Sequence, residues 1–129
     1  MEYLFLLSRV LFGGYFLMSA YGHAKGHAGM LGYAKSKGTP MAEVLVPISG
    51  VLLLLGGLGI LFGVLVPWAV LAIELFLIPV TYFIHPYWKD TDAQAKAMNR
   101  VQFMKNVAIG AGALAFTAVQ TPWMWSLMK

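Results

Sequence analysis

The chain has 129 residues, of which 60% are hydrophobic and only 11% are charged, whereas soluble domains carry roughly 25% charged residues. Together with a mean hydropathy of +0.74, this composition excludes an ordinary soluble domain and indicates an integral membrane protein. The absence of cysteine excludes disulfides, thiolate nucleophiles and cysteine-bound metal centres. The net charge of +4 comes from basic residues in the gaps between apolar runs, which does not favour nucleic-acid binding.

Four apolar runs follow one another, and each has about the length of a transmembrane helix. They cover residues 3–21, 44–66, 67–84 and 101–119. The first run is too long for the core of a signal peptide, so we interpret it as a retained helix. We therefore expect a single domain, residues 1–129, that crosses the membrane four times. The predicted fold is all-α, an antiparallel four-helix bundle within the membrane.

The polar segment between the first two runs contains residues 28–37, which combine the apolar Met30, Leu31, Tyr33 and Ala34 with two lysines. This stretch is expected to form either a short helix lying in the membrane interface or an irregular loop. The second helix is expected to be capped by Thr39, with Glu43 complementing the helix dipole in the first turn. Between the second and third helices only Gly63 and Pro67 mark a boundary, which predicts a tight turn.

The last polar segment, residues 85–100, is predicted to be a loop. Lysine and arginine are concentrated in this segment and in the one between the first two helices. The positive-inside rule therefore places both long loops in the cytoplasm and both termini outside. The basic residues that carry this inference are Lys25, Lys35, Lys37, Lys89, Lys96 and Arg100.

Two charged residues lie inside the apolar runs, where a charge costs roughly 2.5–3.5 kcal/mol on insertion scales. Arg9 and Glu74 lie at similar positions along the first and third helices, which would place both about 10–12 Å deep from the same membrane face. We predict that both face the bundle interior and pair, directly or through water. The pair either fixes helix packing or lines a pocket that binds a quinone head group or relays protons.

A second polar group is expected at the opposite, loop-bearing face, where three helix ends converge. His23 and His27 have the four-residue spacing of metal ligands on a helix, but Gly22 and Gly26 weaken helicity there and no acid lies nearby. All three histidines fall at helix ends, which also disfavours haem. We therefore expect neither metal nor haem, and anchoring at the interface is the simpler role. The members of the group are His23, Lys25, Tyr82, His85, Gln102, Lys105 and Asn106.

Glycines recur on three of the four predicted helices and provide small surfaces along which helices can approach closely. Gly59 and Gly63 form a GxxxG pair. The same surfaces serve either packing within the bundle or contact between two chains.

Several short motifs stand in a characteristic order along the chain. They read Arg9-x3-Gly13-Gly14-x-Phe16, Gly22-x2-Lys25, Gly56-Gly57-Leu58-Gly59 and Phe103-Met104-Lys105-Asn106 with a later Gly110. In this order and spacing the sequence resembles the DoxX family of small four-helix membrane proteins, over residues 7–116. Many members have an acidic residue early in the second helix, whereas this chain has Pro47-Ile48-Ser49-Gly50 there.

The resemblance implies a bacterial-type inner-membrane protein, often a companion of quinol- or thiosulfate-linked oxidoreductases, and it marks Arg9, Lys25, Lys105 and Asn106. The leading hypothesis is an accessory, redox-associated membrane subunit that binds a quinone-like lipid or docks an oxidoreductase partner. One alternative is a small proton-coupled transporter or efflux component that acts as an oligomer and uses Glu74. Another is a purely structural helper of a membrane complex that associates through its glycine faces. No nucleophile, metal set or phosphate loop indicates an enzyme acting alone.

Overall fold

The computed structural model describes residues 1–128, and over this range the chain is helical with no β-strand. The α-helices are α1 (Glu2–Lys25), α2 (His27–Ser36), α3 (Ala42–Phe62), α4 (Val66–Ile84) and α5 (Ala93–Ala115). Two short 3₁₀ helices, η1 (Tyr87–Lys89) and η2 (Phe116–Ala118), follow α4 and α5. The all-α prediction is therefore confirmed.

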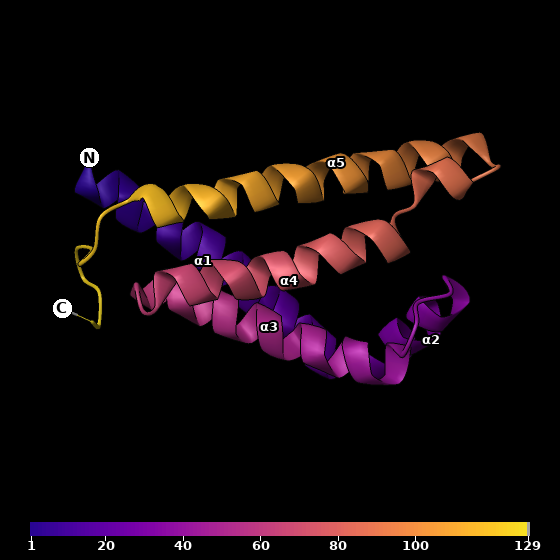
Figure 1. The fold of residues 1–129 in the computed structure, drawn as a ribbon, viewed down its shortest axis with the longest axis horizontal. Helices are drawn as coiled ribbons and strands as arrows, with labels where there is room; N and C mark the ends of the chain where they lie inside the picture. The colour runs from indigo at the N-terminus through magenta and orange to yellow at the C-terminus, as the bar shows by residue number, and fades with distance from the viewer. Residues whose placement is uncertain (129) are drawn as a thin grey trace.

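The four long helices run lengthwise through the molecule, with α1 and α4 pointing in one direction and α3 and α5 in the other (Figure 1). The N-terminus and the last described residues of the chain lie at one end, together with the turn between α3 and α4; we call this the terminal end. Helix α2 and the connection from α4 to α5 lie at the other, which we call the loop end. Contacts join α1 to α3, α3 to α4 and α4 to α5.

Three helical segments are long and apolar enough to cross a membrane: Glu2–Lys25, Ala42–Phe62 and Val66–Lys89. Helix α5 has 23 residues and is therefore about 35 Å long at 1.5 Å per residue. Its first turns are polar, however, and it is not among the helices that meet the same criterion of length and composition. The fourth crossing, by α5, stays a prediction.

The predicted loop over residues 85–100 was wrong in its second half, because α5 begins at Ala93 rather than at Val101. Asp92 caps this helix: its Oδ2 accepts a hydrogen bond from the backbone N–H of Ala95 at 2.8 Å. The first turns of α5 contain alanine, glutamine and lysine, which favour helix without being apolar. Helix α5 therefore extends beyond its apolar run.

Removal of the Asp92 cap is expected to loosen the start of α5. The Asp92→Ala variant should lose about 1 kcal/mol of stability, and the amide hydrogens of residues 93–96 should exchange faster with solvent. Hydrogen exchange measured by mass spectrometry in detergent checks this, with Asp92→Asn, which retains a capping oxygen, as the control. Equal exchange in wild type and Asp92→Ala would show that the cap contributes nothing.

The entry into α3 differs from the predicted one. Met41, in the left-handed region at φ 49°, is the N-cap residue, and no side chain caps the helix. The predicted cap, Thr39, lies outside it, and its Oγ1 is buried without a hydrogen-bond partner in the described chain. Glu43 does lie in the first turn, where its carboxylate pairs with the Lys35 ammonium at 2.6 Å.

Of the two forms expected for residues 28–37, the structure has the short helix, α2.

The turn between α3 and α4 is tight, as predicted, but it begins earlier. Gly63 ends α3 with a φ of +64°, a conformation that favours glycine. The other glycine of the GxxxG pair packs within the chain, because a Cβ at Gly59 would lie 2.3 Å from the Cβ of Ala69. Helix α1 continues past the predicted end to Lys25, whereas α5 ends at Ala115 and passes into η2.

Candidate functional site

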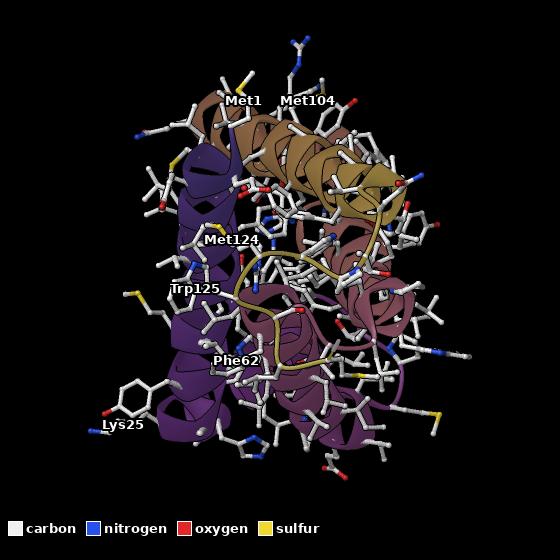
Figure 2. All side chains as sticks on the ribbon, turned by 90° about the vertical axis from the view of Figure 1, so that its left-hand side faces the viewer. Met1, Lys25, Phe62, Met104, Met124 and Trp125 are labelled. Carbon is white, nitrogen blue, oxygen red and sulfur yellow. The ribbon has the colours of Figure 1, made fainter. Side chains whose placement is uncertain are left out.

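Arg9 is fully buried at the terminal end of the bundle. Its guanidinium donates hydrogen bonds to three backbone carbonyls: from Nε to Ile60 at 3.3 Å, from Nη2 to Leu61 at 2.8 Å and from Nη1 to Met124 at 2.5 Å. It also lies 5.1 Å from the centre of the Trp123 ring. Figure 2 views this end and shows the segment with Met124 and Trp125 passing across the helix ends.

The position of Arg9 follows from the end of α3. The last carbonyls of a helix lack intrahelical partners and carry the negative end of the helix dipole. A guanidinium offers five N–H donors in a planar fork and suits such a group of acceptors. The contacts of Arg9 therefore join α1, the end of α3 and the C-terminal segment, and they favour the structural interpretation of this residue.

Arg9 and Glu74 do not form a direct ion pair: over residues 1–128 the salt bridge joins Lys35 to Glu43. Glu74 faces α5 instead, where a Cβ added at Gly110 would lie 3.1 Å from its Oε2. Its Oε1 is buried and has no hydrogen-bond partner in that range. Three of the five N–H donors of Arg9 bond to carbonyls, and a pair bridged by water stays a prediction.

Only part of the predicted second polar group lies at helix ends: because α5 begins at Ala93, Gln102, Lys105 and Asn106 lie near the middle of that helix. The side chains of the group are divided among several contacts. His85 Nδ1 lies 3.2 Å from Asn99 Oδ1, and Asn99 Nδ2 donates to Asp90 Oδ2 at 2.8 Å. Lys105 donates to Gln102 on its own helix. The others separate further: Lys25 lies over the Tyr21 ring, Tyr82 packs on Trp88, His23 lies against Phe76, and Asn106 is buried.

An apolar pocket of about 380 Å³ lies between α2, the first half of α3 and the second half of α4; we call it the α2–α3–α4 pocket. Most of its lining is aliphatic or aromatic, and the aromatic rings include those of Phe76 and Phe83. Four side chains with polar groups line it: His23, Tyr33, Thr39 and Ser49. Neither Arg9 nor Glu74 lines this pocket.

The hydrogen bonds of the polar side chains leave specific atoms for a ligand. The Ser49 hydroxyl donates to the Val46 carbonyl at 2.6 Å, which leaves its lone pairs as acceptors. His23 Nδ1 lies 3.0 Å from the Ser19 carbonyl, so Nδ1 carries the hydrogen and Nε2 is the nitrogen left for a ligand. Thr39 Oγ1 has no partner at all in the described range.

A second pocket, of about 510 Å³, lies between α1 and α3 and is lined by His23, His27 and Pro47 among others. His23 thus borders both pockets. The described residues contain no group of three His, Asp or Glu side chains arranged to hold a metal ion.

Sequence reasoning missed four polar residues: Thr39 as a pocket residue, Thr81, and the pair Asn99 and Asp90. Thr81 on α4 is 7% exposed, and its Oγ1 has no hydrogen-bond partner in the described part of the chain. The sequence did contain a signal for Thr81 and Asn99. Thr81 follows Glu74 by seven residues, and Asn99 precedes Asn106 by seven residues. Seven residues are close to two helical turns, so each pair shares one helix face.

Comparison with known proteins identifies the family of the chain. The family model described as DoxX matches residues 4–86. The inner membrane protein YqjF of Escherichia coli strain K12 is 30% identical over 122 residues, which is 95% of this chain and 87% of that protein. No solved structure matches. The match to the family model covers more than half of the chain, and the chain therefore belongs to the DoxX family.

Proposed function

We propose that the chain is an accessory, redox-associated protein of the bacterial inner membrane that binds a quinone-like lipid in the α2–α3–α4 pocket. The observation that carries this proposal is the pocket itself, an apolar space of about 380 Å³ with polar groups only at a few points. Small-molecule sites are typically apolar, occupy about 300–1,000 Å³ and contain a few polar groups that orient the ligand.

The chemistry of the lining suits a quinone. Phe76 and Phe83 offer aromatic surface for the ring. The unpartnered Thr39 hydroxyl can donate to a quinone carbonyl, and the Nε2 atom of His23 can accept from a quinol hydroxyl. Two of the bounding helices, α3 and α4, are apolar enough to span the membrane, so a ligand dissolved in the lipid phase can reach the pocket from the bilayer.

The partner and the orientation belong to the same proposal. With the long loops cytoplasmic, as the positive-inside rule favours, the quinone head group would lie near the cytoplasmic surface. An oxidoreductase docked on the basic loop end would then meet the ligand there. Arg9 and Glu74 lie outside this site and are not needed to hold the ligand.

Filling the pocket should abolish ligand binding. The Val80→Trp variant, at a lining position, should bind a tritiated short-chain ubiquinone in nanodiscs at least tenfold more weakly, a change of about 1.4 kcal/mol. The Thr39→Val variant, which loses only a hydroxyl, should bind several-fold more weakly, in line with about 1 kcal/mol for one hydrogen bond. Equilibrium dialysis of the reconstituted chains measures both effects.

The matched control is Ile78→Trp, a change on the same helix at a side chain that is 65% exposed and does not line the pocket. It should bind the quinone as wild type does. No saturable binding by the wild-type chain, or an equal loss in both tryptophan variants, would overturn the proposal.

A further inference from the structure

Helices α4 and α5 are antiparallel, and two contacts define their register. At one position Glu74 lies against Gly110, and nearer the loop end His85 Nδ1 lies 3.2 Å from Asn99 Oδ1. The separation between Glu74 and His85 along α4 equals the separation between Asn99 and Gly110 along α5. The two contacts therefore fit one register of the antiparallel helices, without a shift between them. In this register Asn106 falls beside Ile78 of α4.

This register brings polar residues from both helices into one row. At about 100° per residue, Glu74, Thr81 and His85 fall within about 40° of one another around α4, and Asn99, Asn106 and Gly110 do so around α5. From Glu74 toward the loop end, the next member along the axis is Asn106, and Thr81 comes after it. The His85–Asn99 contact is the last. Measured along the helix axis alone, successive members are offset by about 4.5–6 Å at 1.5 Å per residue. We call this series the α4–α5 polar row.

The polar row contains buried atoms whose hydrogen-bonding capacity is not used by the protein. Thr81 is 7% and Asn106 8% exposed. Within residues 1–128, Thr81 Oγ1 and Glu74 Oε1 are buried and lack hydrogen-bond partners. Buried polar atoms are almost always bonded to protein or to ordered water. One bridging water joins groups about 5–6 Å apart through two ordinary hydrogen bonds, a span comparable to the axial offsets along the row.

The two ends of the row differ. At the loop end, His85, Asn99 and Asp90 are linked by hydrogen bonds and are partly exposed to solvent. Beyond Glu74, toward the terminal end, the bundle is closed by buried apolar side chains. They belong to the main core and include Val70, Ala113 and Phe116. The row is therefore open to solution at the loop end and closed at the other.

Few charges surround Glu74. Helix α4 carries no other charged residue, and α3 carries none after Glu43. Helix α1 contributes Arg9, whose N–H groups are engaged by three carbonyls. The basic residues of α5 are exposed. Lys96 and Arg100 lie toward its loop end, and Lys105, near the middle of the helix, donates to Gln102.

We propose that Glu74 exchanges protons with the solution at the loop end through water molecules held along the α4–α5 polar row. Each transfer forms an O–H bond on the acceptor and breaks one on the donor, so the net change is one proton gained or lost by the Glu74 carboxyl. This activity is separate from quinone binding, because the pocket residues Leu75, Phe76 and Pro79 project from a different side of α4.

Infrared spectroscopy of the chain in nanodiscs tests the exchange directly. At acidic pH the C=O stretching band of protonated Glu74 should be present in wild type and absent in Glu74→Gln. On transfer from H₂O to D₂O this band should shift promptly in wild type. In Thr81→Val and Asn106→Leu the shift should be at least tenfold slower, because each variant removes one step of the row.

Two variants separate this role from a general effect on folding. Thr81→Ser retains a hydroxyl and should restore the wild-type rate. Thr117→Val makes the same chemical change as Thr81→Val at an exposed threonine near the terminal end and should leave the rate unchanged. The proposal is overturned if exchange at Glu74 stays fast in both Thr81→Val and Asn106→Leu. It is also overturned if exchange in wild type is as slow as in these two variants. Loss of quinone binding would not alter any of these outcomes.

Discussion

The Arg9→Leu variant should lose at least about 3 kcal/mol of unfolding free energy. Arg9 is fully buried and donates three hydrogen bonds, and bonds to a charged group contribute about 1.5–3 kcal/mol each. The cost of burying the guanidinium offsets part of their sum, but its removal takes the hydrogen-bond partner away from the buried Ile60 carbonyl and the partly buried Leu61 carbonyl. Denaturant titration in detergent micelles measures the loss.

The same substitution should also release the C-terminal segment, because Met124 is held by the Arg9 guanidinium and Trp123 packs against it. Limited proteolysis should then cleave after residue 118 more readily than in wild type. Arg100→Leu, at an exposed arginine of α5, is the control and should change neither readout. A stable, protease-resistant Arg9→Leu protein would show that the contacts of Arg9 are dispensable.

The Gly13→Ala variant should be destabilised by about 1–3 kcal/mol, the usual cost of overpacking. A Cβ at Gly13 would lie 2.8 Å from the carbonyl oxygen of Gly57 and 3.0 Å from the backbone nitrogen of Leu61. Both are backbone atoms of α3 and cannot rotate away, so α1 and α3 must separate. The melting temperature in detergent measures the effect.

The neighbouring glycine provides the control for this substitution. A Cβ at Gly14 would meet nothing within 4 Å, and alanine favours a helix over glycine by up to about 1 kcal/mol. Gly14→Ala should therefore be neutral or stabilising. If the two alanine variants melt at the same temperature, close approach of α1 and α3 at Gly13 does not limit stability.

The apolar runs predicted α1, α3 and α4 well, because a helix that lipid surrounds must be apolar over its whole length. They failed for the start of α5, where residues 93–100 are polar and the helix is supported by the Asp92 cap and by contacts with η1. The cap of α3 was misplaced for a related reason: Thr39 has the right chemistry, but Met41 takes the left-handed conformation at the helix start. Local residue type alone does not determine backbone conformation.

The candidate site was predictable only in part. Arg9 was identified because a charge inside an apolar run requires a partner, and the structure buries it. Its partners were not predictable, because they are backbone carbonyls, which every residue type offers. The α2–α3–α4 pocket depends on how α2 folds back beside α3 and α4, and the sequence pattern gave no sign of that arrangement. The α4–α5 polar row was visible as a seven-residue spacing, but only the register between the helices brings its members together.

The hydrogen bond between Arg9 and Met124 spans 115 residues of the chain and thereby sets an order of events during synthesis. Helix α1 is made first, with a guanidinium whose acceptors on Ile60 and Leu61 do not yet exist. That charge must stay near water or lipid head groups until α3 has been inserted. Its third bond forms only after α5 is complete. A chain that stops before residue 124 therefore carries an incompletely bonded charge in its first helix, a defect by which unfinished chains differ from finished ones.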